Sequence, residues 1–215
     1  MSNHIHVVVA DGHPVCVKGV KLELSGIEIA RVEACAFDST QLFDVLASHA
    51  CDVLICDYVM SGGHFGDGLS MLSQIRQRYP AIKLIVLTSL GSSMVVQALE
   101  RQGVKGIVSK FDRSEHMLHA FHAVWRGETY LSPRIQGALS ADSSAAEAER
   151  MGKLTACEIE VVRLFLSGLS VGEIAAKFGR SKKTVSAQKR AAMRKLDVAS
   201  DIELVRYGIS HGLVA

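Results

Sequence analysis

The chain has 215 residues, of which 48% are hydrophobic, and its formal net charge at pH 7 is only +2. These values are typical of an ordinary globular protein. No apolar run reaches transmembrane length and the N-terminus lacks the pattern of a signal peptide, so we expect a cytoplasmic protein with no membrane contact.

The charge is distributed unevenly along the chain. Residues 1–150 carry 13 Lys and Arg against 16 Asp and Glu, a balance of −3, whereas residues 151–215 carry 11 against 6, a balance of +5. The segment 181–196 holds six basic residues and no acidic one. A mildly acidic first part and a basic second part favour two domains, the second of which faces a polyanion.

The first 127 residues alternate five times between an apolar run and a helical pattern. The expected strands are residues 5–10, 27–35, 53–57, 82–88 and 104–109. The expected helices are residues 14–25, 39–49, 67–79 and 92–102, and a last one, capped by Asp112, that ends near residue 126. This alternation predicts an α/β fold with a doubly wound, five-stranded parallel sheet of order 2-1-3-4-5 and helices on both faces.

Residues 131–151 are small, polar and mildly acidic, which predicts a linker between a domain of residues 1–130 and one of residues 152–215. The second domain shows only helical periodicity. Three of its helices are expected to begin with capping boxes, formed by the pairs Thr155/Glu158, Ser170/Glu173 and Ser200/Glu203. A fourth begins at Ser181. We therefore expect an all-α, four-helix domain with a helix-turn-helix whose recognition helix spans residues 181–196.

Four polar residues lie at the ends of predicted strands: Asp11, Asp57, Thr88 and Lys110. Each alone has an ordinary explanation as a cap, a strand residue or a solvated charge. Together they would converge at one edge of the sheet, where a carboxylate can attack a phosphoryl donor. Magnesium held by one or two carboxylates, with an ammonium and a hydroxyl, would neutralise the phosphate oxygens. A phosphate-ester hydrolase would need an acid–base carboxylate beside the nucleophile, and since none is present we expect no enzyme.

Residues 5–127 resemble the receiver domain of two-component response regulators. The resemblance lies in the stretches Val-Val-Val-Ala-Asp11, Leu-Ile-Cys-Asp57, Ile-Val-Leu-Thr88 and Gly-Ile-Val-Ser-Lys110. It implies a flavodoxin-like receiver with Asp57 as phosphoacceptor, Thr88 as switch hydroxyl and Lys110 as phosphate-binding lysine. It also implies that Mg²⁺ is held by Asp11, Asp57 and the backbone carbonyl of Val59.

The sequence departs from that family at three places, one of which is Met60-Ser61 where the family usually has Met-Pro. The second of the two adjacent acids that follow the first strand is Gly12 here, and the switch aromatic of the fifth strand is Ile107. Loss of one carboxylate should weaken Mg²⁺ binding and slow phosphotransfer. Two hypotheses therefore stand: phosphorylation of Asp57 controls dimerisation and promoter binding, or the receiver is a phosphorylation-independent module for dimerisation or partner binding.

Residues 152–213 resemble the LuxR-type (NarL/FixJ-type) DNA-binding domain. The resemblance lies in Leu154-Thr-Ala-Cys-Glu158-Ile-Glu-Val, Gly168-Leu-Ser-Val-Gly-Glu173-Ile-Ala and Ser181-Lys-Lys-Thr184-Val185-Ser. The continuation of the last stretch to Arg190, and Gly-Asp67-Gly in the first domain, resemble RcsB-type regulators most. The residues that this implies at the DNA are Lys182, Lys183, Thr184, Ser186, Ala187, Gln188, Lys189, Arg190 and Arg194. The last helix would dimerise through Ile202, Val205 and Ile209.

We therefore expect a DNA-binding transcriptional regulator of a two-component phosphorelay. Its expected partners are promoter DNA, a sensor histidine kinase or phosphotransfer protein, and a second copy of the chain or another regulator in a heterodimer. The histidines His116, His119 and His122 share a helix face but lack a carboxylate or cysteine to complete a zinc site, so a polar helix face is expected. His13 and His64 are expected to be solvated loop residues beside the Asp57 pocket.

Overall fold

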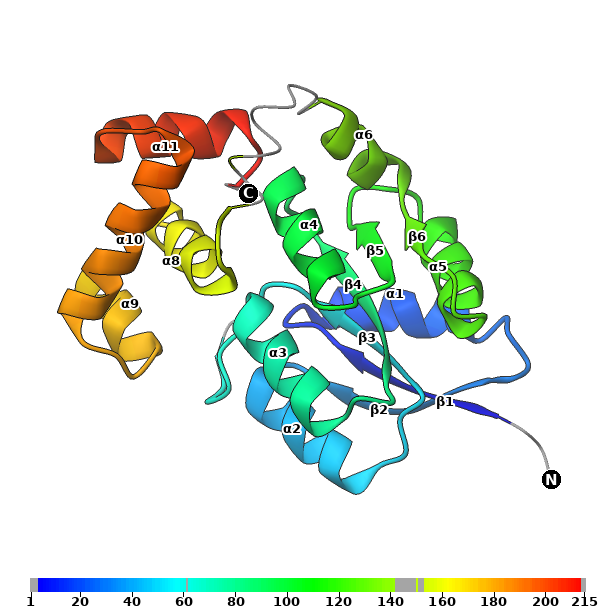
Figure 1. Cartoon of the computed structure of the whole chain (residues 1–215). Helices are drawn as coiled ribbons and strands as arrows, with labels where there is room; N and C mark the ends of the chain where they lie inside the picture. Colours follow the sequence, from blue (N-terminus) through cyan, green and yellow to red (C-terminus); the bar gives the residue numbers. More distant parts are fainter. Residues whose placement is uncertain (1–3, 61, 142–149, 151–152, 214–215) are drawn as a thin grey trace. The chain divides into compact units, whose positions relative to one another are not determined.

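The computed structural model describes residues 4–60, 62–141, 150 and 153–213 (Figure 1). Residues 142–149 and 151 of the predicted linker lie outside this part. The described residues divide into two compact units. The first comprises the residues up to Ser89 and Glu100–Arg134, and the second comprises Leu90–Leu99 and the residues from Ile135 on. Within the described ranges, no helix has the length and apolar character needed to span a bilayer.

The first unit contains a parallel sheet with strand order β2-β1-β3-β4-β5-β6. Its strands are β1 (Ile5–Ala10), β2 (Ala30–Ala36), β3 (Val53–Asp57), β4 (Lys83–Thr88), β5 (Gly106–Ser109) and β6 (Tyr130–Leu131). The predicted order of the first five strands is confirmed. The prediction of only five strands is wrong, because β6 joins the edge beside β5. Its two residues are too few to produce an alternating pattern in the sequence.

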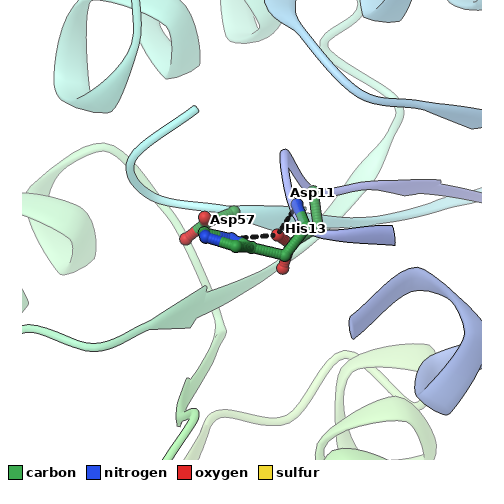
Figure 2. A group of neighbouring side chains, drawn as sticks. All are labelled: Asp11, His13 and Asp57. Carbon is green, nitrogen blue, oxygen red and sulfur yellow. Dashed lines mark hydrogen bonds and ion pairs between the residues drawn. The ribbon is translucent and has the colours of Figure 1, made fainter. Parts of the chain in front are cut away.

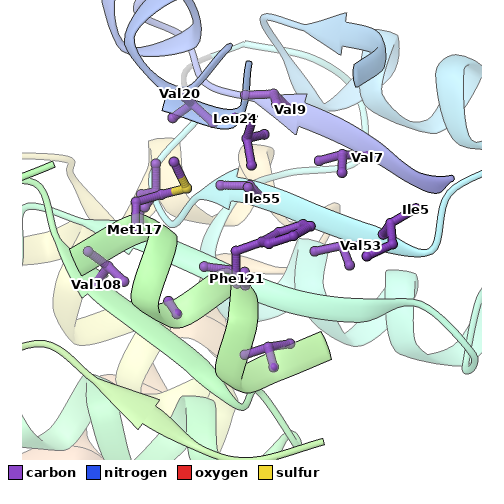
Figure 3. Packing of buried hydrophobic residues seen from close by; sticks show 14 of the residues in the cluster. Ile5, Val7, Val9, Val20, Leu24, Val53, Ile55, Val108, Met117 and Phe121 are labelled. Atoms are coloured by element: carbon purple, nitrogen blue, oxygen red, sulfur yellow. The ribbon is translucent and has the colours of Figure 1, made fainter. Parts of the chain in front are cut away.

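Alternate side chains of the central strands face one layer of helices, as expected from the two-residue repeat of a strand (Figure 3). This cluster includes Val7, Val9, Val53, Ile55, Ile85, Leu87 and Val108 from strands, and Val17, Leu24, Met117 and Phe121 from helices. The intervening residues Val8, Leu54, Cys56 and Val86 are also fully buried. Burial on both faces explains why each strand is a continuous apolar run.

The helices that follow these strands are α1 (Pro14–Leu24), α2 (Ser39–Ser48), α3 (Gly68–Arg78), α4 (Ser93–Arg101) and α5 (Glu115–Trp125). Figure 1 shows α1 and α5 on one face of the sheet and α2 and α3 on the other. Asp38 caps α2 by accepting a hydrogen bond from Gln41 N at 2.9 Å. The predicted cap of α5 by Asp112 is wrong. That helix begins after Ser114, and the Asp112 carboxylate instead accepts a hydrogen bond from Arg134 N at 3.1 Å.

The glycine-rich loop after β3 rests on the N-terminus of α2. His64 N donates to Thr40 Oγ1 at 2.8 Å and Phe65 N donates to Ser39 Oγ at 3.2 Å. Gly63 has φ +80°, and a Cβ there would lie 2.7 Å from Ser39 N. Only glycine combines this left-handed backbone with so close an approach. The loop that follows Asp57 is therefore anchored by contacts that a larger residue would break.

The predicted linker begins with ordered structure. Ser132 Oγ accepts a hydrogen bond from Ser109 N at 2.9 Å, which ties the segment after β6 to the end of β5. The helix α6 (Pro133–Ala141) follows directly. Pro133 suits the first turn of a helix, where a missing N–H costs nothing.

The second unit contains the four predicted C-terminal helices, α8 (Ala156–Leu166), α9 (Val171–Lys177), α10 (Lys182–Leu196) and α11 (Asp201–Ser210). Thr155 and Ser170 form complete capping boxes with Glu158 and Glu173, as predicted. Ser200 caps α11, but the Glu203 carboxylate accepts its hydrogen bond from Ala199 N rather than from Ser200 N. The core of this unit is formed by Val161, Leu164, Ile174, Ala175 and Val185.

Candidate functional sites

The carboxyl edge of the sheet brings three of the four predicted site residues into direct contact. Asp57 ends β3, and Asp11 and Lys110 directly follow β1 and β5. Lys110 Nζ lies 2.8 Å from Asp57 Oδ2 and 2.7 Å from Asp11 Oδ2. Both carboxylates are almost completely buried, with 4% of Asp57 and 1% of Asp11 exposed. One ammonium therefore bridges two buried carboxylates that are 46 positions apart in the chain.

This geometry determines the charge state of the site. Burial raises the pKa of the Asp57 carboxyl above its ordinary value, and the hydrogen bond from Lys110 opposes that rise. Burial also lowers the pKa of Lys110, but its hydrogen bonds to Asp11 and Asp57 outweigh this and raise the pKa. Lys110 is thus held as a cation beside the two carboxylates.

The remaining members of the predicted site lie on the adjoining backbone. Val59 N donates to Asp57 Oδ1 at 3.3 Å, so the residue whose carbonyl was expected at the metal lies beside the carboxylate. Thr88 ends β4 with 1% of its surface exposed, and it follows Leu87, the register partner of Asp57. Thr88 O also accepts a hydrogen bond from Lys110 N at 2.8 Å. Ile107, which stands where the family has its switch aromatic, is fully buried within β5.

His13 belongs to the site more closely than the sequence predicted. Its backbone N donates to Asp11 Oδ1 at 2.8 Å, and its Nδ1 lies 3.2 Å from the same oxygen (Figure 2). One ligand atom from each of Asp11, His13 and Asp57 lies within 4.8 Å of the other two. The sequence signal was the Asp-x-His spacing after the first strand. Among the described residues, no second group of this kind involves His116, His119 or His122.

The residues at this edge fit a divalent cation. Magnesium is held in proteins by one or two carboxylates with water completing the shell, and Asp11 and Asp57 supply two. Gly12 adds no side-chain oxygen. Cys16 is close by, but burial and then the charge of Asp11 raise the pKa of its thiol, so it stays protonated.

The predicted DNA contacts on the recognition helix α10 differ in their exposure. Val185, Ala192 and Leu196 are buried and attach the helix to its unit. The exposed candidates are Lys182, Lys183, Thr184, Ala187, Arg190 and Arg194. Four of them, at positions 183, 187, 190 and 194, have the spacing of a single helix face. Ser186, Gln188 and Lys189 are only partly exposed.

Two lysines of α10 are bound within the unit. Lys189 Nζ lies 2.8 Å from both carboxylate oxygens of Asp201 and 3.9 Å from the centre of the Phe165 ring. Only 12% of the Lys189 side chain is exposed. Lys195 Nζ donates to Glu158 Oε2 at 2.6 Å. These two lysines join the recognition helix to neighbouring helices, which leaves Arg190 as the exposed cation near its centre.

The helix α11 exposes the residues expected at a dimer contact. Ile202 is 68% exposed, Val205 40% and Ile209 65%. They lie at i, i+3 and i+7 and so share one face of the helix. Leu204 and Gly208 on the opposite side are buried, and Gly208 lies against the Leu166 side chain of α8.

Comparisons with known proteins identify a family for each of the two parts of the chain. Residues 7–122 match the family described as "Response regulator receiver domain", and residues 152–208 match "Bacterial regulatory proteins, luxR family". The chain is therefore a response regulator of the family that joins a receiver to a LuxR-type helix-turn-helix domain.

Among individual proteins it is similar to "Transcriptional regulatory protein RcsB" of Escherichia coli (strain K12), with 34% identity over 95% of this chain and 94% of the relative. It is also similar to "Oxygen regulatory protein NreC" of Staphylococcus epidermidis, with 30% identity over 97% of this chain and 98% of the relative. The structure of RcsB from Salmonella enterica serovar Typhimurium bound to promoter P1flhDC with the phosphomimetic BeF3− has a TM-score of 0.84 and 35% identity. That match covers 97% of this chain and 100% of the other.

Proposed function

We propose that Asp57 accepts a phosphoryl group and that its phosphorylation controls dimerisation and promoter binding by the C-terminal helices. The observation that carries this proposal is the bridge from Lys110 to the buried carboxylates of Asp57 and Asp11. The partner that supplies the phosphoryl group would be a sensor histidine kinase or a phosphotransfer protein.

The chemistry follows from what each side chain can do. An Asp57 oxygen attacks phosphorus, the bond from phosphorus to the donor breaks, and the donor leaves with its electron pair. Lys110, already a cation, would pair with a phosphoryl oxygen, and the Thr88 hydroxyl would hydrogen-bond another. Asp11, Asp57 and the Val59 carbonyl would hold a divalent cation, which would further neutralise the phosphate charge.

The DNA contact would be made by the exposed face of α10 that carries residues 183, 187, 190 and 194. Lys183, Arg190 and Arg194 point cations away from the unit, and cations of this kind neutralise phosphates or read guanine in the major groove. A dimer through Ile202, Val205 and Ile209 would present two such helices to a two-fold related DNA site. A heterodimer with a related regulator would use the same apolar face.

The test combines phosphorylation with DNA binding. The full chain is incubated with acetyl phosphate and Mg²⁺, and intact-mass spectrometry measures the added phosphate. We expect one phosphoryl group in the wild type and none in Asp57→Ala. Mobility shifts with a duplex selected from random sequence should strengthen with BeF3− in the wild type and stay unchanged in Asp57→Ala.

The alternative is a receiver that acts without phosphorylation, and the observation in its favour is Gly12 in place of a second acid. The comparisons do not favour it, because the matched RcsB structure was obtained with promoter DNA and a phosphomimetic. Absence of phosphate on wild-type Asp57, together with DNA binding that is indifferent to BeF3−, would support this alternative and refute the proposal.

A further inference from the structure

His13 lies where it can contribute a ligand atom to a metal at the Asp57 site. The Nδ1 atom of its imidazole is 3.2 Å from Asp11 Oδ1, and the side chain is 74% exposed, so the ring can be reached from solvent. The ring lies together with the carboxylates of Asp11 and Asp57 in Figure 2. Two oxygen donors and one nitrogen donor from three residues thus converge within 4.8 Å.

The buried Asp11 carboxylate adds a second observation. Its Oδ2 is paired with Lys110 Nζ at 2.7 Å, and the same ammonium lies 2.8 Å from Asp57 Oδ2. Two buried carboxylates are costly unless positive charge compensates both of them. Lys110 alone supplies one positive charge against two carboxylates. The site therefore has both a ligand set and a negative balance that a divalent cation would neutralise.

The type of donor decides which cation fits. Magnesium takes oxygen ligands, and Gly12 offers no side-chain oxygen where a second carboxylate would favour it. Imidazole nitrogen favours divalent transition metals, whose affinity for such sites rises from Mn²⁺ to Co²⁺ and beyond. We propose that His13 is a nitrogen ligand that makes this site selective for a divalent transition metal over Mg²⁺. The inference deepens the proposed function, because it names the cation that accompanies Asp57 and rests on that site.

Pulsed electron paramagnetic resonance with Mn²⁺ as the probe tests the ligand directly. We expect the full-length wild type to show coupling between Mn²⁺ and an imidazole ¹⁴N, and we expect His13→Ala to lose it. His13 makes no side-chain cap to α1, so this variant keeps the helix start intact. The control His64→Ala changes an exposed histidine of the β3–α3 loop and should keep the coupling. Asp11→Asn should weaken Mn²⁺ binding, which places the signal at this site.

Affinities for Mg²⁺, Mn²⁺ and Co²⁺ alone give the second readout. The Co²⁺ over Mg²⁺ preference of the wild type should shrink by at least about tenfold in His13→Ala, since loss of groups that support a metal costs 10- to 100-fold in affinity. Gly12→Asp should tighten Mg²⁺ binding and thereby reduce the preference for Co²⁺ over Mg²⁺. The inference is overturned if Mn²⁺ bound to the wild type shows no ¹⁴N coupling, or if the preference for Co²⁺ over Mg²⁺ is unchanged in His13→Ala. Phosphorylation of Asp57 by acetyl phosphate is measured separately, so either proposal can fail while the other stands.

Discussion

Lys189 and Arg190 are neighbours on the recognition helix and carry the same charge, but truncating each one should impair a different property of the protein. Arg190 is exposed, whereas Lys189 is held between the Asp201 carboxylate and the Phe165 ring. We therefore expect Arg190→Ala to impair DNA binding and Lys189→Ala to impair the stability of the C-terminal unit. The two variants serve as matched controls because each removes one positive charge from adjacent positions.

The magnitudes follow from the contacts. A cation close to an aromatic ring contributes about 1–2 kcal/mol when it is largely desolvated, and an ion pair with a partner as exposed as Asp201 adds about 0.5 kcal/mol or less. Lys189→Ala should thus cost about 1–2 kcal/mol of local stability. Arg190→Ala should cost about 1–3 kcal/mol of binding, which is roughly 5- to 150-fold in Kd, and should lower the slope of log Kd against log salt by about 1.

Hydrogen-exchange mass spectrometry and mobility shifts separate these outcomes. In Lys189→Ala, peptides from α10 and α11 should exchange about 5- to 30-fold faster, a factor that corresponds to about 1–2 kcal/mol. In Arg190→Ala their exchange should match the wild type, while the selected duplex binds more weakly. The reasoning is refuted if Lys189→Ala weakens DNA binding as much as Arg190→Ala does and leaves exchange unchanged.

Three further changes test the site loop, a partly buried ion pair and the dimer helix. Gly63→Ala forces a Cβ against the start of α2 from a left-handed backbone. The free energy of unfolding of the receiver should therefore fall by about 2 kcal/mol, measured as a lower urea midpoint. An unchanged midpoint would show that the loop is not anchored there. Burial opposes ionisation of Glu158, but Lys195 and Thr155 lower its pKa below the ordinary value. The stability that this carboxylate contributes is therefore present above that ordinary value and lost as the pH falls through the folded pKa. Lys195→Met should accordingly flatten the acid side of a stability-against-pH curve from denaturant titrations, and an equally steep curve would contradict the assignment. Ile209→Ser removes an exposed apolar side chain that a two-fold dimer would bury twice. Sedimentation should therefore show at least about tenfold weaker dimerisation without loss of the monomer fold. An unchanged dimer affinity would exclude α11 as the dimer contact.

Much of the protein is determined by its sequence because the signals are local. Two capping boxes and the caps of α2, α10 and α11 lie where side chains three residues apart predict them. The apolar runs before Asp57 and Thr88 identify strands buried on both faces. Since parallel strands end at a common edge, the sequence also determines that Asp11, Asp57 and Lys110 share one site.

Only the tertiary structure decides what each charged side chain contacts. The basic residues of α10 lie on several faces, and the sequence alone cannot tell Lys189, bound to Asp201 and Phe165, from the exposed Arg190. In the same way β6 is defined by its partner β5 rather than by its own two residues. The position of His13 beside the carboxylates depends on how the first loop turns back over Asp11. Contacts of these kinds depend on three-dimensional packing and leave no periodic pattern in the sequence.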